Sequence, residues 1–287
     1  MTTGEEDCLA SLQRLASPCR LCPRACGVAR DRGEKGFCGV GAEALLASAA
    51  PHFGEEPCLV GRGGSGTLFL AGCNLGCRFC QNWEISQGRT GEPATPAELA
   101  RVMLRLQERG CVNINWVTPT HLVHRLVEAL LLARRDGLTL PLVYNCGGYE
   151  SLAALRLLAG VVEIYMPDLK SLDPAFGAAA LQAPDYPERA RAALVEMQRQ
   201  VGDLELDECG IARKGLLVRH LVMPGRDAGP VLEFLAREIS PRCAVNVMGQ
   251  YHPAGRAREV PGLERSPSRE EVQEARERAF ALGLRLL

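Results

Sequence analysis

The feature that most constrains the fold is an alternation of short apolar segments with helical segments, which starts at Thr67 and continues to the end of the chain. Six segments are short and apolar on both faces, as expected for parallel strands covered by helices: 67–71, 112–117, 142–145, 161–166, 216–221 and 244–248. Helical patterns follow them at 95–109, 118–135, 151–159, 187–201, 230–239 and 268–282. Six such pairs predict a doubly wound parallel sheet or a partial or full α/β barrel. In both folds the functional residues lie at the carboxyl ends of the strands.

Helix-capping signals mark where several of these helices begin. Thr95 and Glu98 have the spacing of a capping box, and Ser268 and Glu271 repeat it before the last helix. The Thr118-Pro pair predicts that Thr118 caps the second helix, because proline is favoured at the first helical position.

Residues 1–66 differ in character from the rest. They hold six of the 13 cysteines, and the pattern predicts two short helices, at 9–16 and 42–50, in otherwise irregular chain. We interpret residues 1–66 as a small cysteine-rich N-terminal module with a lead-in, and residues 67–287 as the barrel domain. A chain of 287 residues is long enough for one α/β barrel.

Charge and hydropathy exclude several classes of protein. The 33 basic and 34 acidic residues give a net charge of −1, which argues against nucleic-acid binding and against a polybasic membrane binder. The longest apolar run extends only from Ala129 to Ala133, whereas a membrane-spanning helix needs about 20 residues. The acidic start of the chain has no apolar signal segment. We therefore expect a cytoplasmic protein, in which clustered cysteines indicate metal or redox chemistry rather than disulfides.

Three cysteines follow the first predicted strand directly, in the sequence Cys73-Asn-Leu-Gly-Cys77-Arg-Phe-Cys80. Three thiolates so close together can bind one face of a cubane cluster, which normally takes four cysteines. One iron is then left open, and an open coordination position is where a metal centre does chemistry. A structural zinc site would require four tight ligands and more often uses pairs of the form C-x2-C. The spacing therefore favours a [4Fe–4S] cluster.

Four more cysteines, Cys19, Cys22, Cys26 and Cys38, form a second set in the N-terminal module. Four thiolates can bind a structural zinc ion or a second iron–sulfur cluster. Zinc would hold the module together, and a cluster could relay electrons. Inert thiols are the third alternative.

The three-cysteine motif at the end of a first barrel strand resembles that of the radical S-adenosylmethionine (SAM) superfamily. The resemblance implies a partial (β/α)6 barrel with a [4Fe–4S] cluster on Cys73, Cys77 and Cys80. It implies that the open iron binds SAM, and that an electron from the reduced cluster cleaves SAM to a 5′-deoxyadenosyl radical. This radical abstracts hydrogen from a substrate, and an external donor such as a flavodoxin or ferredoxin supplies the electron. The chain would thus be an oxidoreductase.

Further motifs narrow the resemblance to the branch related to pyruvate formate-lyase activating enzyme. They extend over nearly the whole chain, at 52–57, 81–86, 117–121, 144–149, 167–170, 217–225 and 249–251. The branch implies a glycyl radical enzyme as the partner to be activated. The chain departs from the branch at Thr118-Pro119-Thr120, because activating enzymes usually carry Gly-Gly-Glu near this position. The group that contacts the methionyl amine is therefore not identified by the resemblance.

The resemblance also suggests side chains that contact SAM. Phe79 matches the residue that packs on adenine, and Asp168 and Lys170 match an Asp-Leu-Lys segment beside the methionyl carboxylate. Asn145 ends the third predicted strand where relatives place an aspartate, which argues against a monovalent cation there. Arg219 is a charge in an apolar strand and needs a partner, either the cofactor's carboxylate or ribose or a structural ion pair.

Other polar residues have simpler interpretations beside the functional one. His121 and His124 share a helix face and form either a paired site or ordinary buried histidines. Gln250 and Tyr251 follow the sixth strand and either contact substrate or belong to an ordinary loop. Cys146 is a candidate hydrogen-atom donor, although an inert thiol is the default for a buried cysteine.

Two classes of function are open at this point. The first is a radical SAM enzyme, acting either on a partner protein that receives a glycyl radical or on a small molecule or peptide. The second is a non-catalytic iron–sulfur or zinc protein for electron transfer or scaffolding. The three-cysteine site argues for the enzyme, because an electron carrier gains nothing from a vacant iron.

Overall fold

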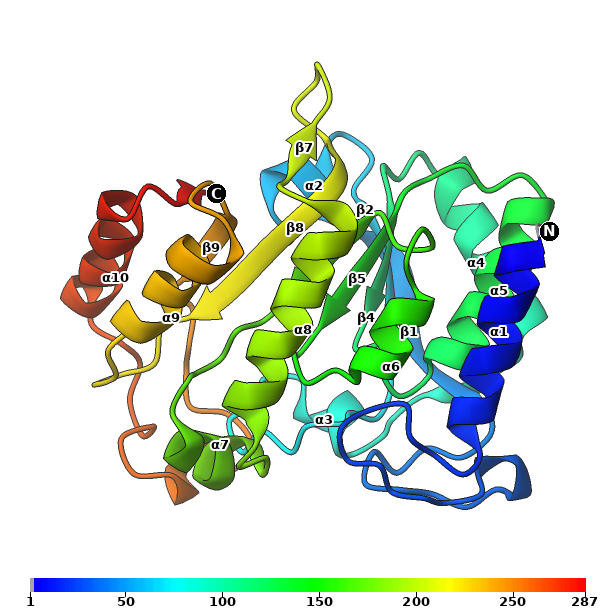
Figure 1. Ribbon diagram of the computed structural model, residues 1–287, viewed down its shortest axis with the longest axis horizontal. Coiled ribbons are helices and arrows are strands. Elements are labelled where there is room, and N and C mark those ends of the chain that lie inside the picture. Colours follow the sequence, from blue (N-terminus) through cyan, green and yellow to red (C-terminus); the bar gives the residue numbers. More distant parts are fainter. Residues whose placement is uncertain (1–2) are drawn as a thin grey trace.

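The computed structural model describes residues 3–287, and a curved sheet with six parallel strands is at its centre (Figure 1). The parallel strands, in their order across the sheet, are β2 (Ser65–Leu70), β4 (Ile114–Val117), β5 (Leu142–Cys146), β6 (Ile164–Pro167), β8 (Ala212–Leu221) and β9 (Ala244–Met248). Neighbouring members of this series pair in parallel throughout.

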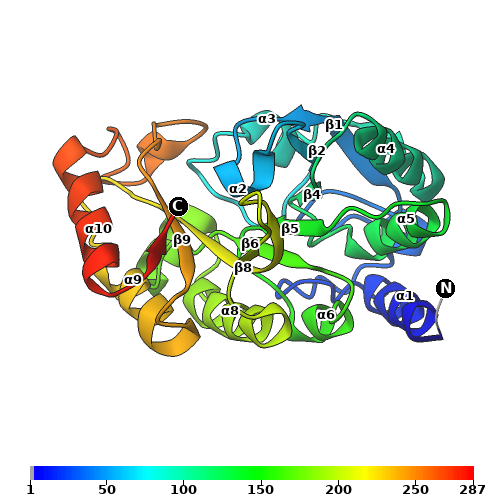
Figure 2. The ribbon, with the colours of Figure 1, turned by 90° about the horizontal axis from the view of Figure 1, so that it is seen from above.

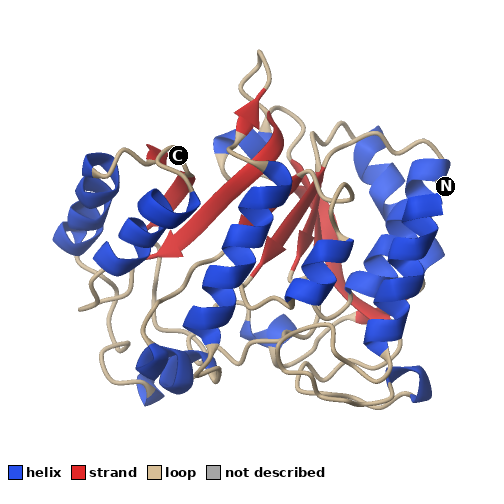
Figure 3. Ribbon diagram, in the orientation of Figure 1, coloured by secondary structure: helices blue, strands red, loops and turns tan. Residues whose placement is uncertain are grey.

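A helix follows each of these strands along the chain. The helices are α4 (Pro96–Glu108), α5 (Val123–Arg135), α6 (Leu152–Leu157), α8 (Tyr186–Val201), α9 (Gly229–Phe234) and α10 (Arg269–Ala281). They lie around the outside of the curved sheet, as Figures 2 and 3 show from two directions. The prediction of six strand–helix pairs in a partial barrel is confirmed.

Shorter elements complete the sheet and its ends. β1 (Ala44–His52) pairs antiparallel with β2, β3 (Glu92–Ala94) pairs with β1, and β10 (Arg285–Leu286) lies beside β9. β7 (Glu205–Leu206) forms a hairpin with β8. The remaining short elements are α2 (Pro57–Val60), α3 (Trp83–Ser86), α7 (Pro174–Leu181), η1 (Arg30–Arg32), η2 (Leu235–Ile239) and η3 (Ala257–Glu259).

The register of the central strands decides which side chains face the inside of the barrel. Trp116, Tyr144 and Tyr165 lie side by side on β4, β5 and β6 and belong to the main core under the helices. The next position along β5 is Asn145, which points to the opposite face because side chains alternate along a strand. Inside the barrel, Leu59 of α2 and inward residues of β5, β6, β8 and β9 form a second apolar cluster. On β2 and β4 the inner face instead carries buried polar side chains, among them Thr67 and Asn115, which lie side by side.

Two local predictions are wrong. Residues 42–50 do not form a helix, because the alanine-rich segment pairs as strand β1 with β2 and β3, and this tertiary pairing overrides helix propensity. Thr118 does not cap the second helix, which starts at Val123 after Leu122. Thr118 instead has a positive φ of 60° and donates its backbone amide to Asn145. The capping boxes at Thr95 and Ser268 are both present as predicted.

The N-terminal residues cover one end of the sheet. α1 (Thr3–Ala16) packs against α5 and α6, and residues 17–43 form loops beyond the carboxyl ends of the strands, drawn in blue in Figure 1. The division of the chain at residue 66 stays a prediction. Among residues 3–287, no helix combines the length and the apolar character needed to cross a membrane.

Candidate functional site

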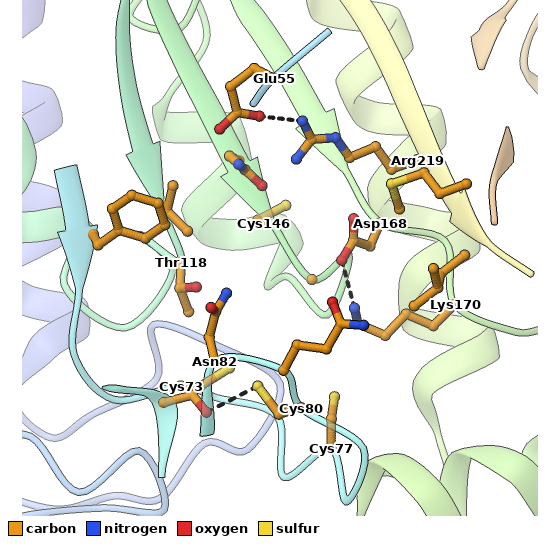
Figure 4. Close-up of a pocket in the computed structure, with 18 of the residues that line it drawn as sticks. Glu55, Cys73, Cys77, Cys80, Asn82, Thr118, Cys146, Asp168, Lys170 and Arg219 are labelled. Atoms are coloured by element: carbon orange, nitrogen blue, oxygen red, sulfur yellow. Dashed lines mark hydrogen bonds and ion pairs between the residues drawn. The ribbon is translucent and has the colours of Figure 1, made fainter. Parts of the chain in front are cut away.

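The three cysteines of the motif lie in the loop after β2, at the carboxyl end of the sheet. Cys73, Cys77 and Cys80 all border a cavity of about 610 Å³, and Figure 4 shows them together at one end of it. The Leu75 amide donates to the Cys73 sulfur at 3.3 Å, and the Cys80 sulfur lies 3.1 Å from the Ser86 hydroxyl. The structure therefore brings the three thiols to one cavity.

Other segments hold this loop in place from outside the cavity. The backbone amides of Gly76 and Arg78 donate to the end of α7, at 3.1 and 2.8 Å. The buried Asn74 side chain donates to the carbonyl of Tyr149 at 2.6 Å. The cysteines are thus carried by a loop whose backbone is fixed at several points, as a preorganised ligand set requires.

Burial and neighbouring charges determine the protonation state of these thiols. Burial raises the pKa of Cys77 to about 12, and the Lys170 ammonium acts in the opposite direction. Burial also raises the pKa of Cys73, and the neighbouring Cys77 adds to the rise. Both are therefore protonated at neutral pH without a metal, whereas a coordinated metal deprotonates a thiol outright.

Asp168 and Lys170, just beyond β6, form an ion pair on the cavity wall between the cysteines and Arg219 (Figure 4). The Lys170 ammonium donates to Asp168 at 2.6 Å. Burial alone would lower the pKa of Lys170, but the Asp168 carboxylate outweighs it and keeps the lysine charged. The Tyr186 hydroxyl fixes this segment, because it accepts from the Lys170 amide at 3.0 Å and donates to the Asp168 carbonyl at 2.8 Å.

Arg219 lies on β8 and points into the cavity, where two glutamates of the loop before α2 meet it. Its guanidinium donates to Glu56 through Nε at 2.8 Å and Nη2 at 2.6 Å, and Nη2 also donates to Glu55. Asn246 of β9 donates to Glu56 at 2.8 Å. Burial alone would raise the pKa of Glu56, but Arg219 and Asn246 hold it below its usual value. The ion-pair alternative for Arg219 is therefore present in the structure.

Phe79 and Asn145, two further predicted contacts, both border the cavity. The Phe79 ring is buried and packs near Phe176 and Tyr251, with centroids 6.0 and 6.1 Å apart. The hydroxyl of Tyr251 donates to the carbonyl of Leu263 at 2.7 Å, and Tyr251 packs against Phe79 without bordering the cavity itself. Its neighbour Gln250 does border the cavity.

The histidine pair lies outside the set of cavity-lining residues. His121 and His124 are both buried, and His121 Nε2 lies 2.9 Å from the carbonyl of Ala71. Burial lowers their pKa values to about 4 and about 3, so both rings are neutral at physiological pH. The interpretation as buried core histidines agrees with this geometry.

Cys146 ends β5 and borders the cavity. Burial raises its pKa, and the nearby Glu150 carboxyl adds to the rise, so that Cys146 is a neutral thiol. Glu150 is itself buried and accepts hydrogen bonds from Thr120 at 2.7 Å and Tyr144 at 3.1 Å. Burial raises the pKa of Glu150 to about 7. A role of Cys146 as a hydrogen-atom donor stays a prediction.

Several cavity residues had no role in the sequence analysis. Glu55 and Glu56 stood inside the motif at 52–57, but nothing local indicated that they pair with a strand more than 160 residues away. Asn82 and Asn246 also border the cavity, and Figure 4 shows Asn82 beside the cysteines. The usable signal was that both glutamates lie inside the motif at 52–57, which marks the segment but not the residue that pairs with it.

The donor set fits an iron–sulfur cluster. Three soft thiol ligands come from one fixed loop, and the adjoining cavity of about 610 Å³ has the size of an ordinary ligand pocket. Among residues 3–287, no three His, Cys, Asp or Glu side chains gather at the spacing of a single metal ion. A four-iron cluster is a larger body than one ion, and its thiolate ligands stand further apart.

Fold and site together define a partial α/β barrel with a three-cysteine loop over a cavity lined by both charged and apolar side chains. A profile of the radical SAM superfamily matches residues 67–235. The chain belongs to this superfamily. Its members use a [4Fe–4S] cluster and SAM and take an electron from an external donor.

Curated relatives and solved structures are similar to the chain at lower levels. The uncharacterized protein MJ0674 of Methanocaldococcus jannaschii is 30% identical over 279 residues, covering 94% of this chain and 76% of that protein. MJ0808 of the same organism is 29% identical over 166 residues, covering 51% of this chain and 48% of the relative. Streptococcus suis SuiB, solved with its precursor peptide SuiA, gives a TM-score of 0.49 at 10% identity, over 75% of this chain and 46% of SuiB. A radical SAM methyltransferase of Sphaerobacter thermophilus gives 0.49 at 14% identity, over 77% and 65%.

Proposed function

We propose that this enzyme binds its cluster through Cys73, Cys77 and Cys80, and that its substrate lies in the same cavity as SAM. The carrying observation is that these three thiols, the Asp168–Lys170 pair and Arg219 all border one cavity. When bound, the reduced cluster and SAM supply a 5′-deoxyadenosyl radical, which removes a hydrogen atom from the substrate.

The side chains of the cavity have distinct parts in this proposal. Phe79 offers an apolar ring for the adenine, and its position is fixed by packing against Phe176 and Tyr251. Lys170 is a charged donor for the methionyl carboxylate, and Asp168 orients it through a 2.6 Å hydrogen bond. Asn145 supplies an uncharged amide at the same wall. Arg219 is committed to Glu55 and Glu56, and we propose that it reaches the ribose or carboxylate only as part of that group.

The rest of the lining suits radical chemistry. Leu70, Leu75, Val117, Leu221 and Met248 supply apolar wall between the polar groups. Such a wall limits water around the reacting atoms and restricts which substrate bond the radical reaches.

The motif series supports a place in the branch related to pyruvate formate-lyase activating enzyme. In that case the substrate is a glycyl radical enzyme, which would insert its glycine-bearing segment into the cavity. A small molecule or a peptide side chain is the second candidate, because a cavity of about 610 Å³ lies in the range of ordinary small-ligand sites. The proposed electron donor is a flavodoxin or a ferredoxin.

The decisive assay is 5′-deoxyadenosine formation by anaerobically reconstituted protein with dithionite and SAM. Cys77→Ala should abolish the product, whereas Cys209→Ala, at an exposed cysteine outside the cavity, should leave it unchanged. If the wild-type protein with a full iron complement forms no product and SAM leaves the electron paramagnetic resonance (EPR) spectrum of its cluster unchanged, the non-catalytic alternative is favoured.

A further inference from the structure

The segments that carry the four N-terminal cysteines, Cys19, Cys22, Cys26 and Cys38, fold against one another. At Gly36, an added Cβ would lie 2.9 Å from the Cys26 sulfur, so Cys26 lies against the segment 36–38. The Ala25 amide donates to the Cys22 carbonyl at 3.1 Å, in a tight turn between Cys22 and Cys26. These contacts hold the segments together, although 19 residues separate the first cysteine from the last.

The backbone of the module is folded around these sulfurs. The Cys19 amide donates to the Val28 carbonyl at 2.9 Å, and the Gly27 amide returns to the Cys19 carbonyl at 3.0 Å. The Phe37 amide donates to the Cys26 sulfur at 3.4 Å. Amide donation to sulfur of this kind tunes iron–sulfur centres.

This module packs directly on the loop that carries Cys73 and Cys77. The Arg24 guanidinium donates to the Asn74 carbonyl at 3.0 Å and stacks on Phe37 at 3.8 Å. At Gly72, next to Cys73, an added Cβ would lie 2.8 Å from the Cys38 carbonyl oxygen. Figure 4 shows the N-terminal segment in blue passing beside Cys73. The backbone at Cys38 therefore lies against the backbone next to Cys73.

The four cysteines differ in their exposure to solvent, and the module around them is basic. Cys19 is buried, Cys22 and Cys38 are half-buried, and Cys26 is exposed, so the set extends from the interior to the surface. Residues 19–41 carry five basic and two acidic side chains, a net charge of +3, whereas the whole chain is at −1. Positive charge favours a thiolate-ligated cluster, which is negative, and favours docking of an acidic electron donor.

We infer that Cys19, Cys22, Cys26 and Cys38 bind a second iron–sulfur cluster, and that this cluster passes electrons from the surface to the cluster on Cys73, Cys77 and Cys80. One electron leaves a reduced low-potential flavin or iron–sulfur protein and enters the N-terminal cluster. The same electron moves to the barrel cluster and is used in the cleavage of SAM. No proton or chemical group is transferred between the clusters. The electron-transfer part rests on the proposed function, whereas the second cluster does not.

Iron analysis tests the second cluster independently of activity. The reconstituted protein should contain about eight irons per chain, and Cys73→Ser/Cys77→Ser/Cys80→Ser should retain about four. The retained cluster should give an EPR signal on reduction that does not respond to SAM. Iron falling to zero in the triple variant, or one zinc per chain in its place, would overturn the inference.

Donor dependence tests the relay. Cys22→Ser/Cys26→Ser should lose about half of the iron, with Cys209→Ser as the matched control that loses none. With a reduced flavodoxin or ferredoxin, this double variant should form 5′-deoxyadenosine at least about tenfold more slowly than the wild type. With the small reductant titanium(III) citrate, which reaches the barrel cluster directly, the rate should fall less than about twofold. Equal losses with both reductants would show that the module is only structural and would refute the relay, whatever the fate of the proposed function.

Discussion

Replacing Arg219 by methionine should strongly destabilise the fold, because this side chain is the cation that pairs with two buried carboxylates. The exposed fractions of the Glu55 and Glu56 side chains are 6% and 1%, and Arg219 donates to both. Methionine preserves most of the side-chain volume but removes the charge. In the wild type, Glu55, Glu56 and Arg219 together have a net charge of −1. In the variant, the two glutamates leave a net charge of −2 in the cavity wall.

The expected loss in the free energy of unfolding depends on the hydrogen bonds that Glu55 and Glu56 keep in the variant. Removing one partner of a buried ion pair costs about 3–5 kcal/mol. In Arg219→Met, Glu56 keeps its hydrogen bond from Asn246 and Glu55 keeps one from Asn115. We therefore expect the lower end, about 3 kcal/mol, which is a large part of the roughly 5–15 kcal/mol that stabilises a typical protein.

The loss should depend on pH in a defined direction. The pKa of Glu56 is lowered in the folded wild type, so its stabilising contribution is present above the unfolded pKa and is lost as the pH falls through the folded one. Without Arg219, burial should raise the Glu56 pKa above that of the unfolded chain. The difference in stability between wild type and variant should therefore be large at pH 7 and smaller near pH 4.

Anaerobic urea unfolding followed by circular dichroism, at equal iron content, measures this difference. Arg219→Met/Glu56→Gln should recover part of the loss, because one uncompensated charge is gone. The control is Arg242→Met, whose side chain is 83% exposed in its pair with Asp203 and should cost less than about 1 kcal/mol. A loss below about 1 kcal/mol in Arg219→Met, or one that grows toward pH 4, would refute the electrostatic reasoning.

Three further predictions concern single positions. Gly72 and Gly160 both have a positive φ, but an added Cβ meets the Cys38 carbonyl oxygen at 2.8 Å only at Gly72. In thermal unfolding, Gly160→Ala should lower the free energy of unfolding by about 1–2 kcal/mol. Gly72→Ala should lower it clearly more and should also lower the iron content. Equal losses in the two variants would contradict the contact between Gly72 and Cys38. Because the pKa of buried Glu150 is raised to about 7, the fold retains a proton that the unfolded chain releases, and stability should fall by roughly 3 kcal/mol between pH 4.5 and 7. Glu150→Gln should flatten this fall, and an unchanged pH slope in urea unfolding would count against it. Thr95→Ala should cost about 1 kcal/mol in the same assay by removing a capping box, and a neutral effect would mean that the cap contributes nothing.

Much of the fold was predictable because its signals are local. The capping box at Thr95 needs only residues three positions apart, and the six apolar strands needed only their own composition. The two wrong assignments failed where distant parts of the chain decide. Strand β1 is fixed by pairing with β2, and the positive φ of Thr118 accompanies its hydrogen bond to Asn145.

The site shows the same division between local and distant information. The spacing of Cys73, Cys77 and Cys80 is contained in one loop, and their common cavity follows from the carboxyl end of one strand. The partners of Arg219 were not predictable, because Glu55 and Glu56 precede it by more than 160 residues. Neither periodicity nor composition carries information about such a pair.

The charges of the cavity wall also account for the asparagine at position 145. Three carboxylates, those of Glu55, Glu56 and Asp168, face two basic groups, those of Lys170 and Arg219. The wall is therefore already at −1 before any thiolate forms. An aspartate at 145 would add another negative charge without a basic partner, at a site 9% exposed to solvent. Asn145 retains the hydrogen-bonding capacity of that position without this cost, which connects the residue at the end of the third strand to ion pairs on distant strands.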